Sequence, residues 1–313
     1  MSILVTGSEG NLGRALVPEL RKRGHVVWGC DLMHSTDQRC IRADVSDAMQ
    51  LSDVFDLARP EVVYHLAAEF GRKNGAGWPR QLWTTNCLGT RNVIELCVES
   101  DAHLIFASSS EAYGNLADNW KCHEGLLATI EDEGSAAYPP HFHCEYALTK
   151  FTNEHQIDIA MRTEGLKATV LRFFNVYGNE RYTPFRSVIC LFIWKLLNKQ
   201  PIVVYSGSRD FLYVDDWTRT AANVCERLDR LQYPAYNIGG MKPWDIPVLA
   251  NMVAKEVGAD RSLMEFTDAE PNNVAAKRPE VLRAVRDLDH RCEVELEEGI
   301  RRTVAWMRKE YGL

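Results

Sequence analysis

The sequence lacks several features that would place a protein in a membrane or on nucleic acid. No apolar run approaches the roughly 20 residues that a transmembrane helix needs, and the chain enters a predicted strand directly, without a signal-peptide pattern. Its 43 acidic residues outnumber its 36 basic ones, which gives a net charge of −7 and no basic stretch. We therefore expect a cytoplasmic protein with no membrane partner and no nucleic-acid partner.

The nine cysteines form no C-x-x-C pair. An odd number of cysteines without a secretory signal is typical of reduced thiols. One group, Cys122 and His123 with His141, His143 and Cys144, could in principle bind zinc. Because no pair of these residues has zinc-finger spacing, we predict no metal site and interpret them as polar loop residues near a binding cleft.

What the sequence does contain is a regular alternation of strands and helices in its first half. The 313 residues, 46% of them apolar, suffice for one large domain or two smaller ones. The apolar patterns predict strands over 60–67, 102–108 and 167–173, and helices over 49–58, 80–100 and 146–162. Such alternation predicts an α/β fold with a doubly wound parallel sheet, whose ligands bind beyond the carboxyl ends of the strands.

The first thirteen residues, MSILVTGSEGNLG, predict a diphosphate-binding turn. A short apolar strand ends at Gly7, and a helix follows that carries Leu12, Leu16 and Leu20 on one face. Glycines let the backbone approach an anion, and the helix N-terminus offers free N–H groups. The spacing is G-x-x-G-x-x-G, over Gly7, Gly10 and Gly13, rather than the G-x-G-x-x-G of the Rossmann fingerprint.

A second predicted strand, over 25–31, ends in Asp31. An acid about 20 residues beyond the glycines is where the ribose hydroxyls of NAD are held, and a carboxylate there repels the additional phosphate of NADP. We therefore predict NAD. The alternative is that Asp31 merely ends a strand.

Tyr146 and Lys150 lie one helical turn apart on the same predicted face. A nearby ammonium and a cationic nicotinamide ring would lower the pKa of the phenol, so that Tyr146 could take a proton from a sugar hydroxyl. Alone this pair also fits a solvated helix face. Together with the glycine turn and the predicted strand that ends in Ser108, Ser109 and Ser110, it predicts a catalytic site.

On these motifs the chain resembles the extended short-chain dehydrogenase/reductases of the NAD-dependent nucleotide-sugar epimerase/dehydratase family. The matching segments are TGSEGNLG, Asp31, ADVSD (43–47), HLAAE (65–69), the N-x-x-G-T-x-N run (86–92), SSSEAYG (108–114), YALTK (146–150), LRFFNVYG (171–178) and RDFLYVDD (209–216). The resemblance implies a Rossmann-type sheet with a smaller mixed α/β substrate domain. We predict an NAD-binding domain over 1–178 with about 206–237, and a substrate-binding domain over 179–205 and 238–313.

The resemblance also implies roles for individual residues. Ser109, Tyr146, Lys150 and Glu111 are implied as catalytic, with Tyr146 the base and Lys150 its partner. The implied NAD contacts are Gly7, Gly10, Asn11, Leu12, Gly13, Asp31, Asp44, Val45, Leu66, Ala67, Ala68 and Asn86, with Tyr146 and Lys150. The implied contacts to a nucleotide-diphosphate sugar are Glu69, Ser110, Asn175, Arg209 and Arg278. A homodimer through the helices around 80–100 and 146–162 is implied as well.

The implied reaction begins with removal of a proton from the C4 hydroxyl by Tyr146 and transfer of the C4 hydride to NAD. The 4-keto sugar can then be epimerised, dehydrated, or decarboxylated if C6 is a carboxylate. Family frequency favours a 4-epimerase, whereas Glu111 favours a 4,6-dehydratase or a uronate decarboxylase. A keto-sugar reductase and a non-catalytic NAD-binding protein are more remote alternatives. The loops over 70–79 and 115–145 are expected to affect substrate choice, although plain surface excursions fit them equally.

After Gly178 the regular alternation fades. We predict short strands over 201–205, 210–214 and 236–238 and helices over 185–197, 215–228, 246–257 and 295–309, with Asp215 or Asp216 capping the second of these helices.

Overall fold

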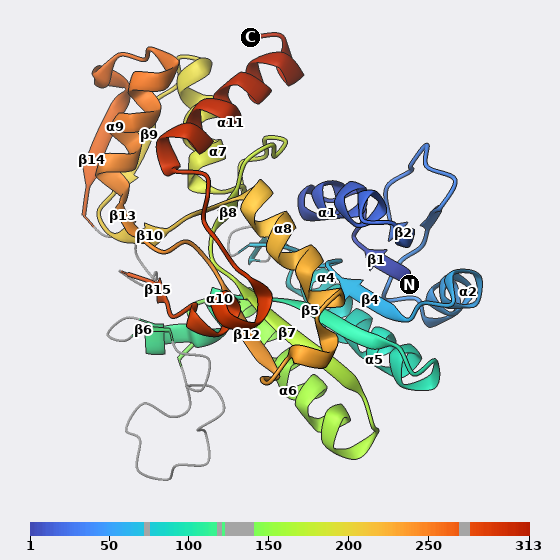
Figure 1. Cartoon of the computed structure of the whole chain (residues 1–313). Helices are drawn as coiled ribbons and strands as arrows, with labels where there is room; N and C mark the ends of the chain where they lie inside the picture. Colours follow the sequence, from blue (N-terminus) through green and yellow to red (C-terminus); the bar gives the residue numbers. More distant parts are fainter. Residues whose placement is uncertain (72–75, 118–120, 123–140, 269–275) are drawn as a thin grey trace, which may run out of the picture.

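A seven-stranded parallel sheet organises the chain (Figure 1). This computed structural model describes residues 1–71, 76–117, 121–122, 141–268 and 276–313. The strand order is β12-β7-β5-β4-β1-β2-β3, and every pairing is parallel. The strands are β1 Ser2–Thr6, β2 Val26–Asp31, β3 Cys40–Arg42, β4 Val62–His65, β5 His103–Ser109, β7 Lys167–Phe173 and β12 Ala235–Ile238. The predicted Rossmann-type α/β fold is confirmed.

Helices cover both faces of this sheet, as the alternation predicted (Figure 1). One face packs against α1 (Asn11–Lys22) and α8 (Val214–Cys225), and the other against α2 (Ala48–Ala58), α5 (Gly89–Glu99) and α6 (Glu145–Thr163). Successive side chains of β1 point to opposite faces, so Ile3 and Val5 enter the first core and Leu4 enters the second. Both faces are buried, which is why β1 reads as an unbroken apolar run.

A smaller group of elements faces the carboxyl ends of the sheet's strands (Figure 1). It contains α7 (Val188–Leu197), α9 (Ile246–Val257), α11 (Leu296–Tyr311) and the parallel pair of β9 (Ile202–Tyr205) with β14 (Met264–Thr267). One hydrophobic core joins Leu16 of α1 to Ile193 of α7 and Leu249 of α9. The predicted boundary between two domains therefore stays a prediction, because apolar packing runs across it.

Short elements complete the described chain. The pairs are β8 (Val176–Tyr177) with β11 (Leu212–Tyr213), β10 (Ser208–Asp210) with β13 (Pro243–Asp245), and β6 (Lys121–Cys122) with β15 (Arg278–Pro279). The remaining helices are α4 (Pro79–Trp83) and α10 (Leu282–Leu288), with short helical turns over Thr84–Leu88, Ser110–Ala117, Leu228–Arg230 and Arg261–Leu263.

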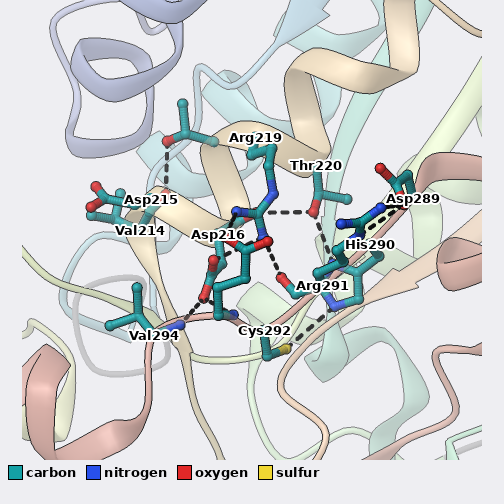
Figure 2. A network of polar contacts seen from close by, with 12 residues as sticks. Val214, Asp215, Asp216, Arg219, Thr220, Asp289, His290, Arg291, Cys292 and Val294 are labelled. Carbon is teal, nitrogen blue, oxygen red and sulfur yellow. Dashed lines mark hydrogen bonds and ion pairs between the residues drawn. The ribbon is translucent and has the colours of Figure 1, made fainter.

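The predicted cap of α8 by Asp215 or Asp216 is wrong. The helix begins earlier, at Val214, so both acids lie inside its first turn and no side chain caps it. The buried carboxylate of Asp216 instead accepts hydrogen bonds from the backbone N–H groups of Glu293 and Val294, at 3.0 and 2.9 Å, and from Arg219 at 2.9 Å. Figure 2 shows how this network fixes the segment before α11 against α8.

Two other elements differ from their predicted form. The apolar run from 185 becomes helical only at Val188, because Ser187 caps α7 by accepting a hydrogen bond from the N–H of Cys190. The predicted helix over 80–100 contains one turn of π-helix, over Thr84–Leu88. No helix among the described residues is long and apolar enough to cross a membrane. All nine cysteines are described, and each is a free thiol.

Candidate active site

A cavity of about 970 Å³ opens beyond the carboxyl ends of the central strands, between the sheet and the smaller group of elements. Ligand pockets span about 300 to 1,000 Å³, so the volume suits a large ligand or two. The predicted residues that line it are Gly7, Gly10, Asn11, Leu12, Gly13, Asp31, Asp44, Val45, Leu66, Ala67, Ala68, Glu69, Ser109, Ser110, Glu111, Tyr146, Asn175 and Arg209. Asn86, Lys150 and Arg278 are not among the lining residues.

The glycine turn fits a diphosphate closely. Gly7 has a φ of +72°, and a Cβ added to Gly13 would lie 2.3 Å from the carbonyl oxygen of Gly7. Gly10 precedes the first residue of α1 and has no side chain that could cap the helix. The backbone N–H groups in the first turn of α1 are therefore left for an anion. A Cβ at Gly7 would likewise lie 2.7 Å from the backbone nitrogen of Ala67, so the tight backbone packing of this turn requires glycine.

Asp31 and Asp44 lie where the adenosine half of NAD is expected. Asp31 ends β2, and its carboxylate accepts hydrogen bonds from the N–H groups of Glu9 and Met33, both at 2.9 Å. Asp44 accepts from the N–H and the hydroxyl of Ser46, both at 2.8 Å. Asp31 therefore also holds the glycine turn in place, a structural role that its position in the sequence did not reveal.

Asn86 shapes the cavity wall from behind. Its side-chain carbonyl accepts from the N–H of Glu69 at 2.8 Å, and its amide donates to the Glu69 carbonyl at 3.1 Å. The π-helical turn around Asn86 alters the backbone pairing there, and Asn153 of α6 donates to the Asn86 carbonyl at 2.9 Å. Asn86 thus positions the segment after β4. The resemblance had implied a direct contact between Asn86 and NAD.

Tyr146 and Ser109 meet inside the cavity. The phenol of Tyr146 lies near enough to the hydroxyl of Ser109 for that hydroxyl to affect its pKa, and both side chains line the cavity wall. Lys150 lies beneath them, where its ammonium donates to the carbonyl of Ala107 at 2.7 Å and stands 5.9 Å from the centre of the Tyr146 ring. The structure therefore brings three of the four predicted catalytic side chains to one place.

Burial shifts the pKa values of Tyr146 and Lys150. Burial raises the pKa of Tyr146, the hydrogen bond from Ser109 opposes this rise, and the charge of Glu111 adds to it. Burial also lowers the pKa of Lys150, to about 8. Without NAD, the pKa of Tyr146 therefore lies above its usual range. The predicted lowering of this pKa also required the nicotinamide ring, so it stays a prediction. The positive nicotinamide ring of NAD is the remaining group that favours the phenolate.

Glu111 has a partner that the sequence did not suggest. The ammonium of Lys277 lies 2.6 Å from a carboxylate oxygen of Glu111, and the Lys277 side chain is only 2% exposed. Its neighbour Arg278, the predicted substrate residue, is exposed and belongs to β15, which pairs with β6. The cation that approaches the cavity from this segment is therefore Lys277. The signal was present, since a lysine precedes Arg278 in the KRPEV run.

The far wall of the cavity is formed by Asn175, by the segment between β8 and α7, and by Arg209 of β10. Asn175 has a φ of +34° and donates to the carbonyl of Asp210 at 2.9 Å, and Arg209 donates to the carbonyl of Ser208 at 2.8 Å. Arg186 lies over the ring of Phe70, with its guanidinium carbon 4.3 Å from the ring centre. The sequence analysis missed this contact, which joins the two sides of the cavity mouth.

The suggested zinc group is only partly described. His123 lies outside the described residues, as does most of the loop over 115–145 and the middle of the loop over 70–79. Within the described ranges, no group of three or more His, Cys, Asp or Glu residues could hold a metal ion.

The pattern of the NAD dependent epimerase/dehydratase family matches residues 3–239 of this chain. The chain belongs to this family. UDP-glucuronate 4-epimerase 1 of Arabidopsis thaliana is 27% identical over 100% of this chain and 78% of its own length. UDP-N-acetyl-alpha-D-glucosaminuronate decarboxylase of Bacillus cytotoxicus is 26% identical over 98% of this chain and 97% of its own. A UDP-glucose 4-epimerase of Thermus thermophilus, solved with NAD, shares 26% identity and a TM-score of 0.83, over 98% of this chain and 99% of that one.

Membership in the family makes this protein an NAD-dependent enzyme that modifies nucleotide sugars. The predicted cofactor is confirmed as NAD, and the glycine turn and Asp31 are the local structures that fit it. Relatives of about 27% identity include both an epimerase and a decarboxylase. Membership in the family therefore does not determine which reaction the sugar undergoes.

Proposed function

We propose that this enzyme is an NDP-sugar 4-epimerase that acts through a 4-keto intermediate. The observation that carries the proposal is that Tyr146 and Ser109 line the same cavity as the glycine turn, with Lys150 next to the Tyr146 ring. This arrangement supports a role for Tyr146 as the proton acceptor beside a sugar and a nicotinamide ring. The roles proposed for Glu69, Ser110, Asn175 and Arg209 follow from their positions on the cavity wall.

In the proposed mechanism, NAD supplies the site that accepts and returns the C4 hydride. Tyr146 takes the proton of the C4 hydroxyl and later returns it, while Ser109 holds the same oxygen through its hydroxyl. Lys150 contributes positive charge below the phenol and is fixed by its hydrogen bond to Ala107. An epimerase also needs space for the keto sugar to turn over, which the volume of the cavity supports.

A uronate decarboxylase is the second candidate, and the Glu111–Lys277 pair favours it. Glu111 lines the cavity and Lys277 stands behind it, so together they offer an acid/base group and a buried cation. A cation beside the sugar would attract a carboxylate at C6, and Glu111 could move a proton at C5. The same acid/base role would serve a 4,6-dehydratase.

One experiment separates these reactions. The purified enzyme is incubated with UDP-, dTDP-, GDP- and CDP-sugars, including uronates, and the products are examined by mass spectrometry and NMR. We expect a product of unchanged mass with inverted C4. Loss of CO2 would select the decarboxylase, and loss of water would select the dehydratase. Turnover only with added NADH would indicate a reductase, and bound NAD without turnover of any sugar would indicate a binding protein.

We further propose that the enzyme is a cytoplasmic homodimer. Leu88, beside α5, and Ile159 of α6 are apolar side chains that are each 50% exposed on the helices predicted to form the interface. Light scattering tests this assembly, and Ile159→Arg should shift a dimer to the monomer. A wild-type monomer would refute it.

A further inference from the structure

The segment between β8 and α7 carries a buried carboxyl group that the proposed chemistry does not use. Glu180 is 6% exposed and lines the cavity. One of its oxygens accepts a hydrogen bond from the side-chain amide of Asn11, at 3.4 Å, and the other accepts from the hydroxyl of Ser187. Asn11 begins α1 directly after the glycine turn, and Ser187 caps α7. One carboxyl group therefore joins the N-termini of two helices that border the cavity.

The surroundings of Glu180 offer it little compensating charge. Among the described residues, no Lys, Arg or His forms an ion pair with it, and Arg181 pairs with Glu310 at 3.0 Å instead. The thiol of Cys190 faces the Glu180 backbone carbonyl, at 3.6 Å. The charge of Arg186, which lies over the ring of Phe70, acts on Glu180 from the same segment. Burial raises the pKa of Glu180 to about 7, although Ser187 and Arg186 oppose the rise.

NAD adds negative charge to this region. Its diphosphate belongs at the glycine turn, next to the first residue of α1, and Asn11 is the residue that Glu180 contacts. An ionised carboxylate and a diphosphate in one poorly solvated cavity repel each other, so binding of the diphosphate favours the neutral acid. A neutral acid keeps both of its hydrogen-bonded neighbours and removes the repulsion.

We propose that Glu180 is a positioning residue that holds the glycine turn and the N-terminus of α7 around NAD, and that it takes up a proton from solvent when NAD binds. The inference rests on the NAD site alone and is independent of the sugar and of its fate. It assigns to Glu180 a linkage between dinucleotide affinity and pH near neutrality.

The test is calorimetry of NAD⁺ binding to enzyme freed of bound dinucleotide, in two buffers of different ionisation enthalpy. For the wild type above pH 7, the observed heats should differ between buffers and report net proton uptake, and the affinity should fall by up to about tenfold per pH unit. Equal heats in both buffers at pH 8 would overturn the proposal. This arm needs no variant and no sugar turnover.

Two variants identify the group responsible. Glu180→Gln mimics the neutral acid and should lose the proton uptake and the pH dependence that Glu180 contributes. Lys150, with a pKa of about 8, titrates in both proteins. Glu310→Gln, which removes a carboxylate bound to Arg181, should keep the wild-type pH dependence. If Glu180→Gln retained the wild-type proton uptake, another group would be responsible and the assignment of Glu180 would be wrong.

Discussion

The two sides of the cavity are built in different ways. On the dinucleotide side, the glycine turn lies within the first thirteen residues and consists of backbone, with Asp31 following at the end of the neighbouring strand. On the side proposed to hold the sugar, Glu111 and Lys277 come from segments far apart in the chain. The first side follows from local sequence, whereas the second depends on tertiary contacts. A family can therefore keep its cofactor while its members differ in the sugar chemistry.

The largest effect is expected at the point where the two sides meet. Tyr146→Phe removes only the phenol oxygen, so proton transfer is lost while the ring still fills its site. Turnover should fall about 10³-fold or more, because general acid–base catalysis contributes about 10² to 10⁴ and the Ser109 contact is lost too. Steady-state kinetics measure the loss, and NAD⁺ titration should show that the dinucleotide still binds.

A matched control for this variant is Tyr233→Phe, which removes a phenol oxygen outside the cavity, where Arg283 lies over the ring. Its turnover should equal that of the wild type. Near-normal activity in Tyr146→Phe would contradict the role of Tyr146 as the proton acceptor. It would also remove the basis for comparing a dinucleotide side and a sugar side of the cavity.

The next largest effect is expected for Gly13→Ala, which tests whether the backbone packing of the glycine turn is required for NAD⁺ binding. Gly13→Ala places a Cβ 2.3 Å from the Gly7 carbonyl oxygen and 2.6 Å from the Ser8 Cα, and neither backbone atom can move without displacing β1. We expect loss of NAD⁺ binding and a destabilisation of about 3 kcal/mol or more, at the upper end of overpacking costs. Urea unfolding measures the change. Gly77→Ala, where a Cβ meets nothing within 4 Å, is the control and should be almost neutral.

The contrast between the two sides also explains which expectations came from sequence. Strand β1 with its glycine turn, and Tyr146 with Lys150, each follow from one short segment, and the structure brings them together as predicted. The KRPEV run offers Lys277 as a candidate cation, but its contact with Glu111 could not be predicted in this way, since that contact depends on β15 pairing with β6. The position of Asn86 also depends on tertiary contact, because side chains of α6 pair with the altered backbone of its π-helical turn.

Glu180 offers a test in which stability, rather than binding, is measured. Its pKa is about 7 in the folded protein against 4.5 for an ordinary glutamate. Between these two values the unfolded chain releases a proton that the folded protein keeps, so stability falls as pH rises and is level above pH 7. At about 1.4 kcal/mol per pKa unit, the loss totals roughly 3 kcal/mol.

Glu180→Gln has no carboxyl group to ionise, so it should avoid this loss. In enzyme freed of NAD, the variant should gain up to roughly 3 kcal/mol over the wild type at pH 8 and almost nothing near pH 4. Urea unfolding at several pH values measures the difference. A constant difference between the two proteins across this range would show that Glu180 does not titrate as described.

The smallest effect concerns the adenosine end of the cavity, where a side chain rather than backbone makes the contact. Asp31→Ala removes the predicted partner of the ribose hydroxyls and should raise the Michaelis constant or dissociation constant for NAD about tenfold, which is about 1.4 kcal/mol. Part of this loss could come from the glycine turn, because Asp31 also accepts a hydrogen bond from the N–H of Glu9.

The variant Asp31→Asn separates these two contributions, because it keeps an acceptor for that N–H but lacks the negative charge. An unchanged affinity in Asp31→Ala would refute the ribose contact, whereas full recovery in Asp31→Asn would assign the loss to the turn. An intermediate affinity in Asp31→Asn is what we expect if one carboxylate serves both the ribose and the turn, and it would show that even the dinucleotide side depends on one side chain.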